Sequence, residues 1–354
     1  MFRISFPEPD IFKTMPDVIS WGRMKLLLSI YSAFSRPVCR LKRGLHRTGI
    51  LRAEGASLPV VSIGNLAMGG SEKTPLAMDL LGFLMEIGRK PALITRGYKS
   101  AWERTGGVLS NGRTITGTWR EGGDEPFLAA RRCAGAGVYV GKDRLASCRR
   151  AREAGFDVAV LDDGFQHLHL RRDLDIVLYD PAVRTPLREG PSALAAADVV
   201  LMKNRLEGPA LRAGRAVFFS YEVRERGIVP LEDGPTQPLS SLRGRRIYAF
   251  CGIARPERFF ELLAAAGSAP AARSAFPDHF DYPDPALVRL AAAARAADCP
   301  VLLPTEKDAV KIRDRRGWMA GFEVHVLRIG LVLPAGFHER VRSAVENFPR
   351  GGRA

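Results

Sequence analysis

Short apolar runs rich in valine and isoleucine alternate with segments of helical periodicity between residues 58 and 223. Strands that are buried on both faces give such runs, and their alternation with helices indicates a mainly parallel sheet covered on each side. The predicted strands are LPVVSIG (58–64), KPALITRGY (90–98), AGVYVG (136–141), FDVAVLDD (156–163), LDIVLYD (174–180), ADVVLMKN (197–204) and AVFFSYEV (216–223). The predicted fold class is α/β, with a doubly wound sheet.

The pattern changes at RERGIVPLEDGPTQPLSSLRG, which is polar, rich in turn residues and without helical periodicity. We predict a first domain over 51–225 and a linker or small ribbon over 226–244. The strand, loop and helix pattern then resumes in RRIYAFCGIARPERFFELLAAAG. A second, smaller α/β domain is predicted over 245–345, followed by a flexible tail at 346–354. A chain of 354 residues is long enough for two domains with separate cores.

The first 50 residues differ from the rest. After Trp21 an apolar stretch is followed by a basic one that contains Arg40, Lys42, Arg43 and Arg47. The apolar stretch is too short to span a bilayer, which takes about 20 residues. An amphipathic helix on the membrane surface and a helix packed on the protein core both fit this pattern. We expect residues 1–50 to be a basic, membrane-surface region.

The net charge of +15 predicts attraction to a polyanion, either nucleic acid, an anionic membrane or a phosphorylated substrate. Nucleic acid is disfavoured, because the chain has no interleaved aromatic and basic residues, helix-turn-helix pattern or zinc-ligand spacing. The five cysteines form no CxxC pair and the chain shows no cleavable secretory signal, so we expect a reducing cytoplasm.

The segment PVVSIGNLAMGGSEKTPLAMDLL places a glycine-rich turn and Lys-Thr between a strand and a helix. This is the context of a phosphate-binding P-loop. Lys73 is expected to reach the terminal phosphates, and the Thr74 hydroxyl to ligate magnesium. The backbone N–H groups expected to hold phosphate oxygens belong to Gly69, Gly70, Ser71 and Glu72.

Two residues depart from the P-loop pattern, because Ala67 and Glu72 stand where it has glycine. A carboxylate about 4 Å from a phosphate charge opposes it by about 4 kcal/mol, or about a thousandfold in affinity. If Glu72 points outward instead, it suits the helix dipole and can pair with a cation. The sequence leaves both orientations open.

A second polar cluster is LDDGFQH, where a predicted strand ends in Asp162 and Asp163. Open α/β sheets bind ligands at this carboxyl edge, and one carboxylate there can hold magnesium. His167 follows on the same edge. Shorter segments at other strand ends or helix starts are TRGY with Arg96, GDEP with Asp124, and VGKDR with Arg144.

In this order and spacing, nine blocks closely resemble the tetraacyldisaccharide 4'-kinase family. They are SIGNLAMGGSEKTP, TRGY, GDEP, VGKDR, LDDGFQH, LRE, FCGIARPERFF, FPDHFDY and TEKDAVK, and the resemblance extends to about residue 312. It implies an ATP- and Mg²⁺-dependent enzyme with a P-loop domain and a smaller α/β domain around a cleft. The implied reaction is phosphorylation of the 4'-hydroxyl of a tetraacyldisaccharide 1-phosphate in lipid A biosynthesis. The implied partners are this lipid and an anionic membrane surface, at the cytoplasmic face of the bacterial inner membrane, and not nucleic acid.

The resemblance also implies roles for single residues. Asp162 and Glu189 correspond to magnesium partners in addition to Thr74. Asp124 resembles the carboxylate that activates the sugar hydroxyl, paired with His279 across the cleft. The other implied residues are Asp163 and His167 on the catalytic edge, and Arg96, Arg144 and Arg188, which would neutralise phosphate charge.

Three departures set this chain apart from the family pattern. The segment PAVRTPLREG, between Asp180 and Glu189, is shorter than usual, and Pro304 replaces a usual threonine. Glu72 is the third. They keep open a second hypothesis, a catalytically impaired relative that binds lipid or nucleotide.

Overall fold

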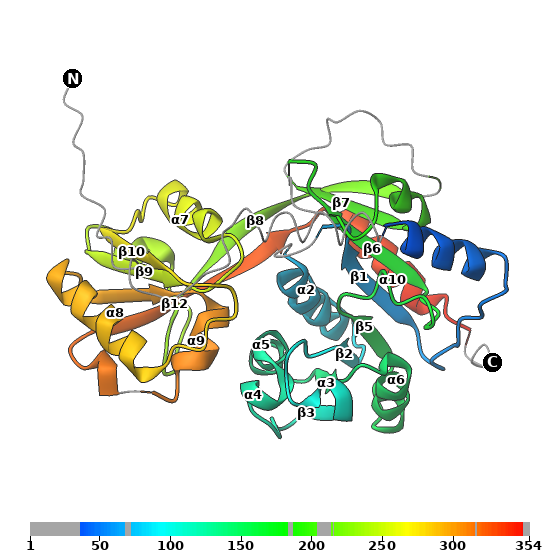
Figure 1. Ribbon diagram of the computed structural model, residues 1–354, viewed down its shortest axis with the longest axis horizontal. Helices are drawn as coiled ribbons and strands as arrows, with labels where there is room; N and C mark the ends of the chain where they lie inside the picture. Colours follow the sequence, from blue (N-terminus) through cyan, green and yellow to red (C-terminus); the bar gives the residue numbers. More distant parts are fainter. Residues whose placement is uncertain are drawn as a thin grey trace.

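The protein, described here by a computed structural model covering residues 36–67, 72–182, 187–203, 214, 216–315 and 317–349, has two lobes (Figure 1). Two long strands connect the lobes. A single sheet of twelve strands continues through both of them. The mainly parallel α/β architecture predicted from the apolar runs is confirmed.

The first lobe contains the predicted P-loop region. Its elements are β1 (Val60–Asn65), α2 (Lys73–Glu86), β2 (Pro91–Thr95), α3 (Trp102–Thr105), β3 (Gly107–Asn111), α4 (Trp119–Gly122), α5 (Asp124–Arg132), β4 (Gly137–Val140), α6 (Arg144–Glu153), β5 (Val158–Leu161), β6 (Leu174–Tyr179), the 3-10 helix η1 (Pro191–Ala196) and β7 (Val199–Lys203). The strand order is β7-β6-β1-β5-β2-β4-β3, and only β3 is antiparallel to its neighbour. Because β1, β5 and β2 are adjacent and parallel, the loops that follow them meet at one edge.

The second lobe repeats the alternation on a smaller scale. Its elements are the 3-10 helix η2 (Leu239–Leu242), β9 (Ile247–Cys251), α7 (Pro256–Ala265), β10 (Ala272–Ala275), α8 (Asp284–Ala296), β11 (Val301–Pro304), α9 (Glu306–Ile312), η3 (Gly317–Met319) and β12 (Glu323–Val332). The strand order is β10-β9-β11-β12, all parallel. Its core lies between this sheet and α8 and α9, and includes Phe250, Leu287 and Ile312.

Strand β8 (Val217–Pro230) joins the two lobes. Its first residues pair in parallel with β7, and Glu222–Pro230 pairs antiparallel with β12. The expected boundary at residue 225 therefore lies inside a strand, and the first residues of the expected linker belong to a ribbon. Exposed and partly buried positions alternate along the middle of β8, which explains the polar sequence there.

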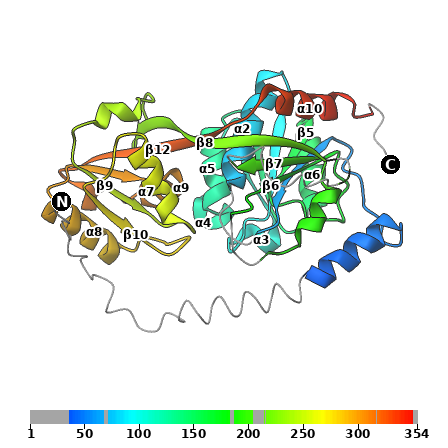
Figure 2. The same ribbon diagram turned by 90° about the horizontal axis from the view of Figure 1, so that it is seen from above.

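Helix α10 (Ala335–Glu346) returns to the first lobe (Figure 2). Its Phe337, Val341 and Val345 are buried in the core that also contains residues of α2 and β1. The predicted second domain over 245–345 thus includes a helix that packs on the first. An amphipathic pattern shows that a helix has an apolar face, but not which of two cores that face covers.

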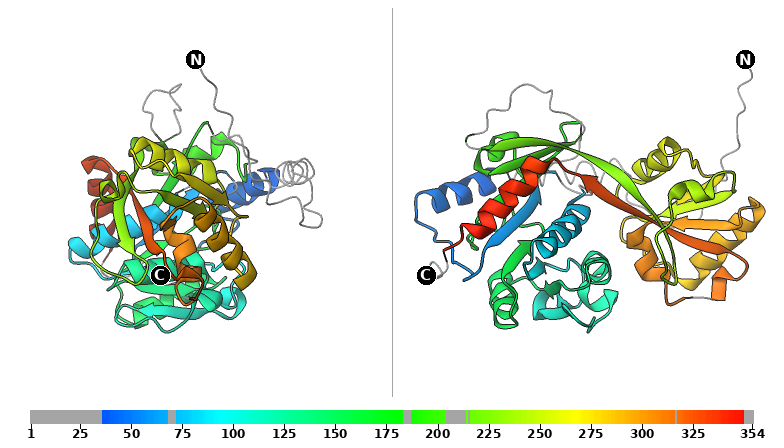
Figure 3. Two further views of the ribbon diagram at one scale, coloured as in Figure 1. Left: turned by 90° about the vertical axis from the view of Figure 1, so that its left-hand side faces the viewer. Right: turned by 180° about the vertical axis from the view of Figure 1, so that it is seen from behind.

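Residues 36–47 form a helix on the surface of the first lobe, drawn in blue in Figure 3. The earlier part of the expected amphipathic region, including Trp21, lies outside the described residues. Within the described ranges, the structure has no helix that is both long and apolar enough to cross a membrane.

Candidate active site between the two lobes

The P-loop helix, the LDDG turn and the LRE segment meet at Asp163. Lys73 Nζ lies 3.2 Å from Asp163 Oδ1, and Arg188 Nη1 lies 2.7 Å from Asp163 Oδ2. Lys73 also donates a hydrogen bond of 3.1 Å to Asn65 at the end of β1. Burial alone would raise the pKa of Asp163, but the charges of Lys73 and Arg188 outweigh it and hold that pKa below its usual range.

The LDDG turn packs closely on the P-loop strand. A Cβ at Gly64 in β1 would collide with Phe165, so only glycine allows this approach. Asp163 has φ 53°, a left-handed conformation that aspartate tolerates better than most residues. The close packing of Phe165 on Gly64 and the left-handed turn at Asp163 together bring the carboxylates of Asp162 and Asp163 to the sheet edge.

Asp162 has the properties of a cation ligand. Its Oδ2 accepts a hydrogen bond of 3.4 Å from Thr95, whereas its Oδ1 is buried and has no hydrogen-bond partner. Burial, together with the charges of Glu125 and Asp163, raises the pKa of Asp162 to about 7 although Lys73 opposes the shift. A buried carboxylate oxygen without a partner fits a site that takes a hard cation such as Mg²⁺.

Glu189 has a different partner from the one expected. It is 2% exposed, and Arg43 of the N-terminal helix donates to both of its oxygens, the shorter contact being 2.8 Å. The Arg43 guanidinium also lies 4.3 Å from the centre of the Phe165 ring. Among the described residues no group of three acidic, histidine or cysteine side chains comes together that could hold a metal ion. In this structure Arg43 balances the charge of Glu189.

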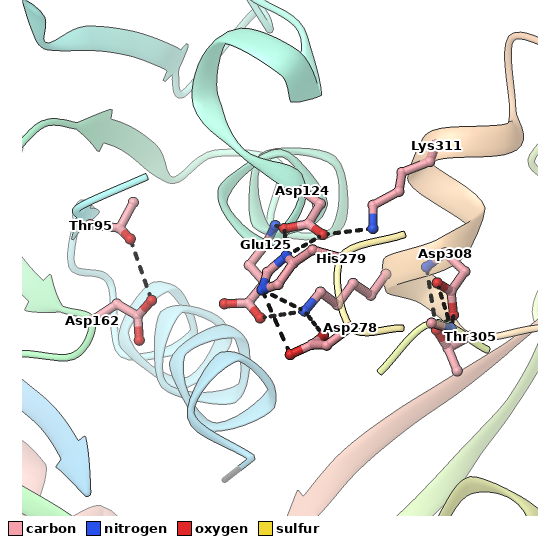
Figure 4. A network of polar contacts seen from close by, with 11 residues as sticks. Thr95, Asp124, Glu125, Asp162, Asp278, His279, Thr305, Asp308 and Lys311 are labelled. Carbon is pink, nitrogen blue, oxygen red and sulfur yellow. Dashed lines mark hydrogen bonds and ion pairs between the residues drawn. The ribbon is translucent and has the colours of Figure 1, made fainter. Parts of the chain in front are cut away.

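A second cluster lies where the lobes face each other (Figure 4). Asp124 begins α5 in the first lobe and is 8% exposed. His279 Nδ1 of the second lobe lies 2.9 Å from its Oδ2, and Lys311 Nζ of α9 lies 2.9 Å from the same oxygen. The structure thus brings together the predicted pair Asp124 and His279 from segments 155 residues apart.

The hydrogen bonds fix the tautomer of His279. Lys307 Nζ lies 3.3 Å from Nε2, and an ammonium group can only donate. Nε2 therefore accepts, which leaves the proton on Nδ1, from where it is donated to Asp124. Lys307 is also 3.1 Å from Glu125 and 3.0 Å from Asp278.

These cations determine the ionisation of Asp124. Burial alone would raise its pKa, but the hydrogen bond from His279 and the charges of Lys307 and Lys311 hold the pKa of Asp124 well below its usual range. Burial would likewise lower the pKa of Lys307, whereas Glu125, Asp124 and Asp278 raise it. Asp124 and Lys307 are therefore both ionised at neutral pH.

Sequence reasoning missed Lys307, Lys311 and Glu125 as members of this cluster. The signal was present, because Lys307 and Lys311 are four residues apart in TEKDAVK and so share one face of a helix. That helix is α9, which begins where Thr305 accepts a hydrogen bond from the backbone N–H of Asp308.

The structure answers the question of Glu72, which has φ 52° and immediately precedes α2. Its Oε1 is 2.6 Å from Lys203 Nζ and 2.7 Å from Arg258 Nη1, and Tyr221 donates to Oε2 at 3.4 Å. The carboxylate is thus neutralised by cations of β7 and α7. The other expected P-loop residues Gly69, Gly70 and Ser71 lie outside the described ranges.

Four predicted residues remain, namely Arg96, Arg144, His167 and Thr74. Arg96 Nε is 2.6 Å from Glu103, and Arg144 is buried and donates to the Lys142 carbonyl. Burial, followed by the charge of Arg144, lowers the pKa of His167 to about 4. The last of them, Thr74, is the second residue of α2.

The chain is similar in sequence to known proteins of one family. The family model for tetraacyldisaccharide-1-P 4'-kinase matches residues 24–346. A tetraacyldisaccharide 4'-kinase of Anaeromyxobacter dehalogenans is 38% identical over 323 residues, with 85% of each chain covered. The tetraacyldisaccharide 4'-kinase of Geobacter metallireducens is 37% identical over 311 residues, and the match covers 81% of this chain and 89% of the relative.

A solved structure is similar as well. The crystal structure of LpxK from Aquifex aeolicus in complex with ATP has a TM-score of 0.74 and 25% sequence identity. The match covers 91% of this chain and 99% of that one. Sequence and fold agree over nearly the whole chain, and this protein belongs to the tetraacyldisaccharide 4'-kinase family, the ATP-binding kinases of lipid A biosynthesis.

Proposed function

We propose that the protein transfers the γ-phosphoryl group of ATP to the 4'-hydroxyl of a tetraacyldisaccharide 1-phosphate in the space between the lobes. The carrying observation is the contact of 2.9 Å between Asp124 and His279, which come from different lobes. Figure 4 shows Asp162, which lies at the same sheet edge as Lys73, in one close-up with Asp124 and Glu125, and we place the sugar-hydroxyl site beside that edge.

Asp124 is proposed to orient the attacking hydroxyl. In the reaction the hydroxyl oxygen bonds to the γ-phosphorus, the bond to the β–γ bridging oxygen breaks, ADP leaves, and the hydroxyl proton passes by way of the Asp124 carboxylate to solvent. Because the transition state is loose, this proton is transferred late and positioning dominates. An ionised carboxylate accepts the hydroxyl hydrogen bond, and the neighbouring His279 stabilises Asp124 in that orientation.

The phosphates are proposed to bind at the first turn of α2, with Lys73 and Arg188 supplying positive charge. Asp162 and the Thr74 hydroxyl are the proposed ligands of Mg²⁺, which when bound neutralises charge on the β- and γ-phosphates. Glu189 is a weaker candidate for this role, because both its oxygens accept from Arg43.

The helix at 36–47 supports action at a membrane surface. Val38 and Leu41 are 51% and 64% exposed, beside the exposed cations Arg36, Arg40 and Lys42. Apolar and basic side chains on one exposed helix suit the headgroup region of an anionic membrane. We propose peripheral binding there, at the cytoplasmic face of the inner membrane.

The test is a kinase assay with ATP, Mg²⁺ and detergent-dispersed disaccharide 1-phosphate, with the bisphosphate product measured. Asp124→Asn is expected to lower kcat about 10²- to 10⁴-fold, the usual contribution of a positioned acid or base. Arg149→Gln, which alters an exposed pair on α6, serves as the control. Full activity of Asp124→Asn would exclude the proposed role of Asp124, and no product above a Lys73→Ala background would exclude the proposed function.

The alternative of an impaired relative rests on three departures: Glu72, the short segment between Asp180 and Glu189, and Pro304. The contacts of Lys203 and Arg258 with the Glu72 carboxylate weaken the first of these reasons.

A further inference from the structure

Glu72 links the P-loop to both lobes. Lys203 stands at the end of β7 in the first lobe, and Arg258 stands in the first turn of α7 in the second. Their nitrogens are 2.6 Å and 2.7 Å from the same Glu72 oxygen. Arg258 also lies 2.7 Å from Asp180, which follows β6. Two anions and two cations therefore alternate across the boundary between the lobes.

The contact is sheltered from solvent. The side chains of Glu72, Asp180 and Lys203 are 13%, 15% and 17% exposed, and that of Arg258 is 31% exposed. Ion pairs shielded in this way contribute more than fully exposed ones. The carboxylates of Glu72 and Asp180 raise the pKa of Arg258, although its burial opposes the shift.

The backbone at Glu72 is in a conformation that favours glycine. With φ 52° and ψ 19° it is left-handed, which is unfavourable by about 1 to 2 kcal/mol for most residues with a side chain. Glycine would relieve this strain but would remove both ion pairs. The Glu72 side chain thus gives up the backbone flexibility of glycine and makes two ion pairs that glycine cannot make.

We propose that Glu72 is a positioning residue, which docks helix α7 of the second lobe onto the P-loop through Arg258. The contact at Glu72 is then added to those between α5 and the second lobe, where Asp124 meets His279 and Arg132 lies 2.8 Å from Glu306. Because Glu72 immediately precedes Lys73, a shift of the loop would also move α7. This inference goes beyond the proposed function, because it concerns how loop and lobe are coupled rather than which reaction follows.

Two readouts test the proposal on the full chain. The first is the distance between spin labels at exposed positions of α6 and α8, introduced as Glu153→Cys and Val288→Cys with Cys39→Ser. In Glu72→Gln and in Arg258→Met we expect a broader distance distribution than in the labelled parent. Glu54→Gln, which removes the carboxylate of an exposed pair with Arg149 in the first lobe, is the matched control and is expected to leave the distribution unchanged. An unchanged distribution in both test variants would overturn the proposal.

The second readout is kinetic. Glu72→Gly is expected to lower kcat about tenfold, the equivalent of about 1.4 kcal/mol in the barrier, while the KM for ATP changes less. The double variant Glu72→Gln with Arg258→Met is expected to lose less activity than the product of the two single losses, since both substitutions break the contact between these two residues. A rise in kcat/KM for ATP in Glu72→Gly, or additive losses in the pair, would contradict the proposal. The spin-label result does not depend on activity, so failure of the kinase assay leaves this test intact.

Discussion

The ionisation of one buried carboxylate of the first lobe, Asp124, depends on residues from two segments of the second lobe. Asp124 is contacted by His279 and Lys311, and Lys307 lies close enough to affect its charge. A carboxylate removed from water is stable as an anion only when such partners replace its hydration. The hydrogen bond from His279 lowers the pKa of Asp124 most, and the charges of Lys307 and Lys311 lower it further.

We predict that Lys311→Met moves the acidic limb of the kcat profile to higher pH. The present pKa of Asp124 is depressed, so its ionised form is retained until the pH falls through that low value. Removing the Lys311 charge raises the pKa of Asp124, and protonation then begins at a higher pH. The profile is measured between about pH 3 and pH 9, which spans the usual pKa values of carboxylates and imidazoles. Exposed Lys90→Met is the charge-matched control, and an acidic limb at the wild-type pH would show that Lys311 acts only in packing.

At the scale of elements, the ribbon of β8 and β12 determines how the lobes are joined. Gly227 has φ +90°, and a Cβ there would collide with the Gln237 carbonyl. The backbone of Ile228 exchanges hydrogen bonds of 2.8 Å with Gln237, which places this loop against the ribbon. Gly227 is therefore required both for its conformation and for the close approach of another backbone.

Gly227→Ala is expected to lower the free energy of unfolding by about 2 to 4 kcal/mol, because it combines left-handed strain with a backbone collision. Gly244→Ala is the matched control, with φ +80° but open space around the added methyl group, and about 1 kcal/mol is expected for its strain. Urea denaturation of both variants measures the difference. Equal losses would show that the approach of Gln237 is unimportant.

At the scale of the whole molecule, the net charge of +15 favours approach to an anionic surface. The helix at 36–47 adds exposed apolar side chains to this charge. Arg43 and Glu189 attach that helix to the LRE segment near Asp163. A membrane-bound helix would therefore be physically connected to the candidate active site.

We predict that the full chain binds vesicles containing anionic lipid and that the binding weakens as salt is added. Arg40→Gln with Lys42→Gln is expected to reduce affinity roughly tenfold or more, at about 1 kcal/mol for each basic residue. Arg243→Gln with Arg289→Gln removes the same charge from exposed positions of the second lobe and is the control. Vesicle co-sedimentation measures the membrane affinity of both double variants. Equal losses of affinity in the two would show that net charge, and not the helix at 36–47, governs binding.

The sequence alone predicted the alternation of strands and helices, a mainly parallel sheet and the family. These features depend on local apolar periodicity and on short motifs, both of which lie in contiguous residues. It also paired Asp124 with His279 through the family resemblance. The extra strand β3 was missed, since GVLSN has no long apolar run. The length of β8 was also missed, because exposed polar residues alternate with partly buried ones along its middle, which gives it a composition similar to that of a linker.

Tertiary structure decided which partner each charge has. Three carboxylates have partners from distant segments, and no local pattern specifies such pairs. The pairs are Glu189 with Arg43, Asp124 with Lys311, and Glu72 with Arg258. The orientation of Glu72 illustrates the reason. Its sequence position left two orientations open, one facing the phosphates and one paired with a cation. A side chain turns toward the nearest compensating charge, and only the folded chain determines where that charge lies.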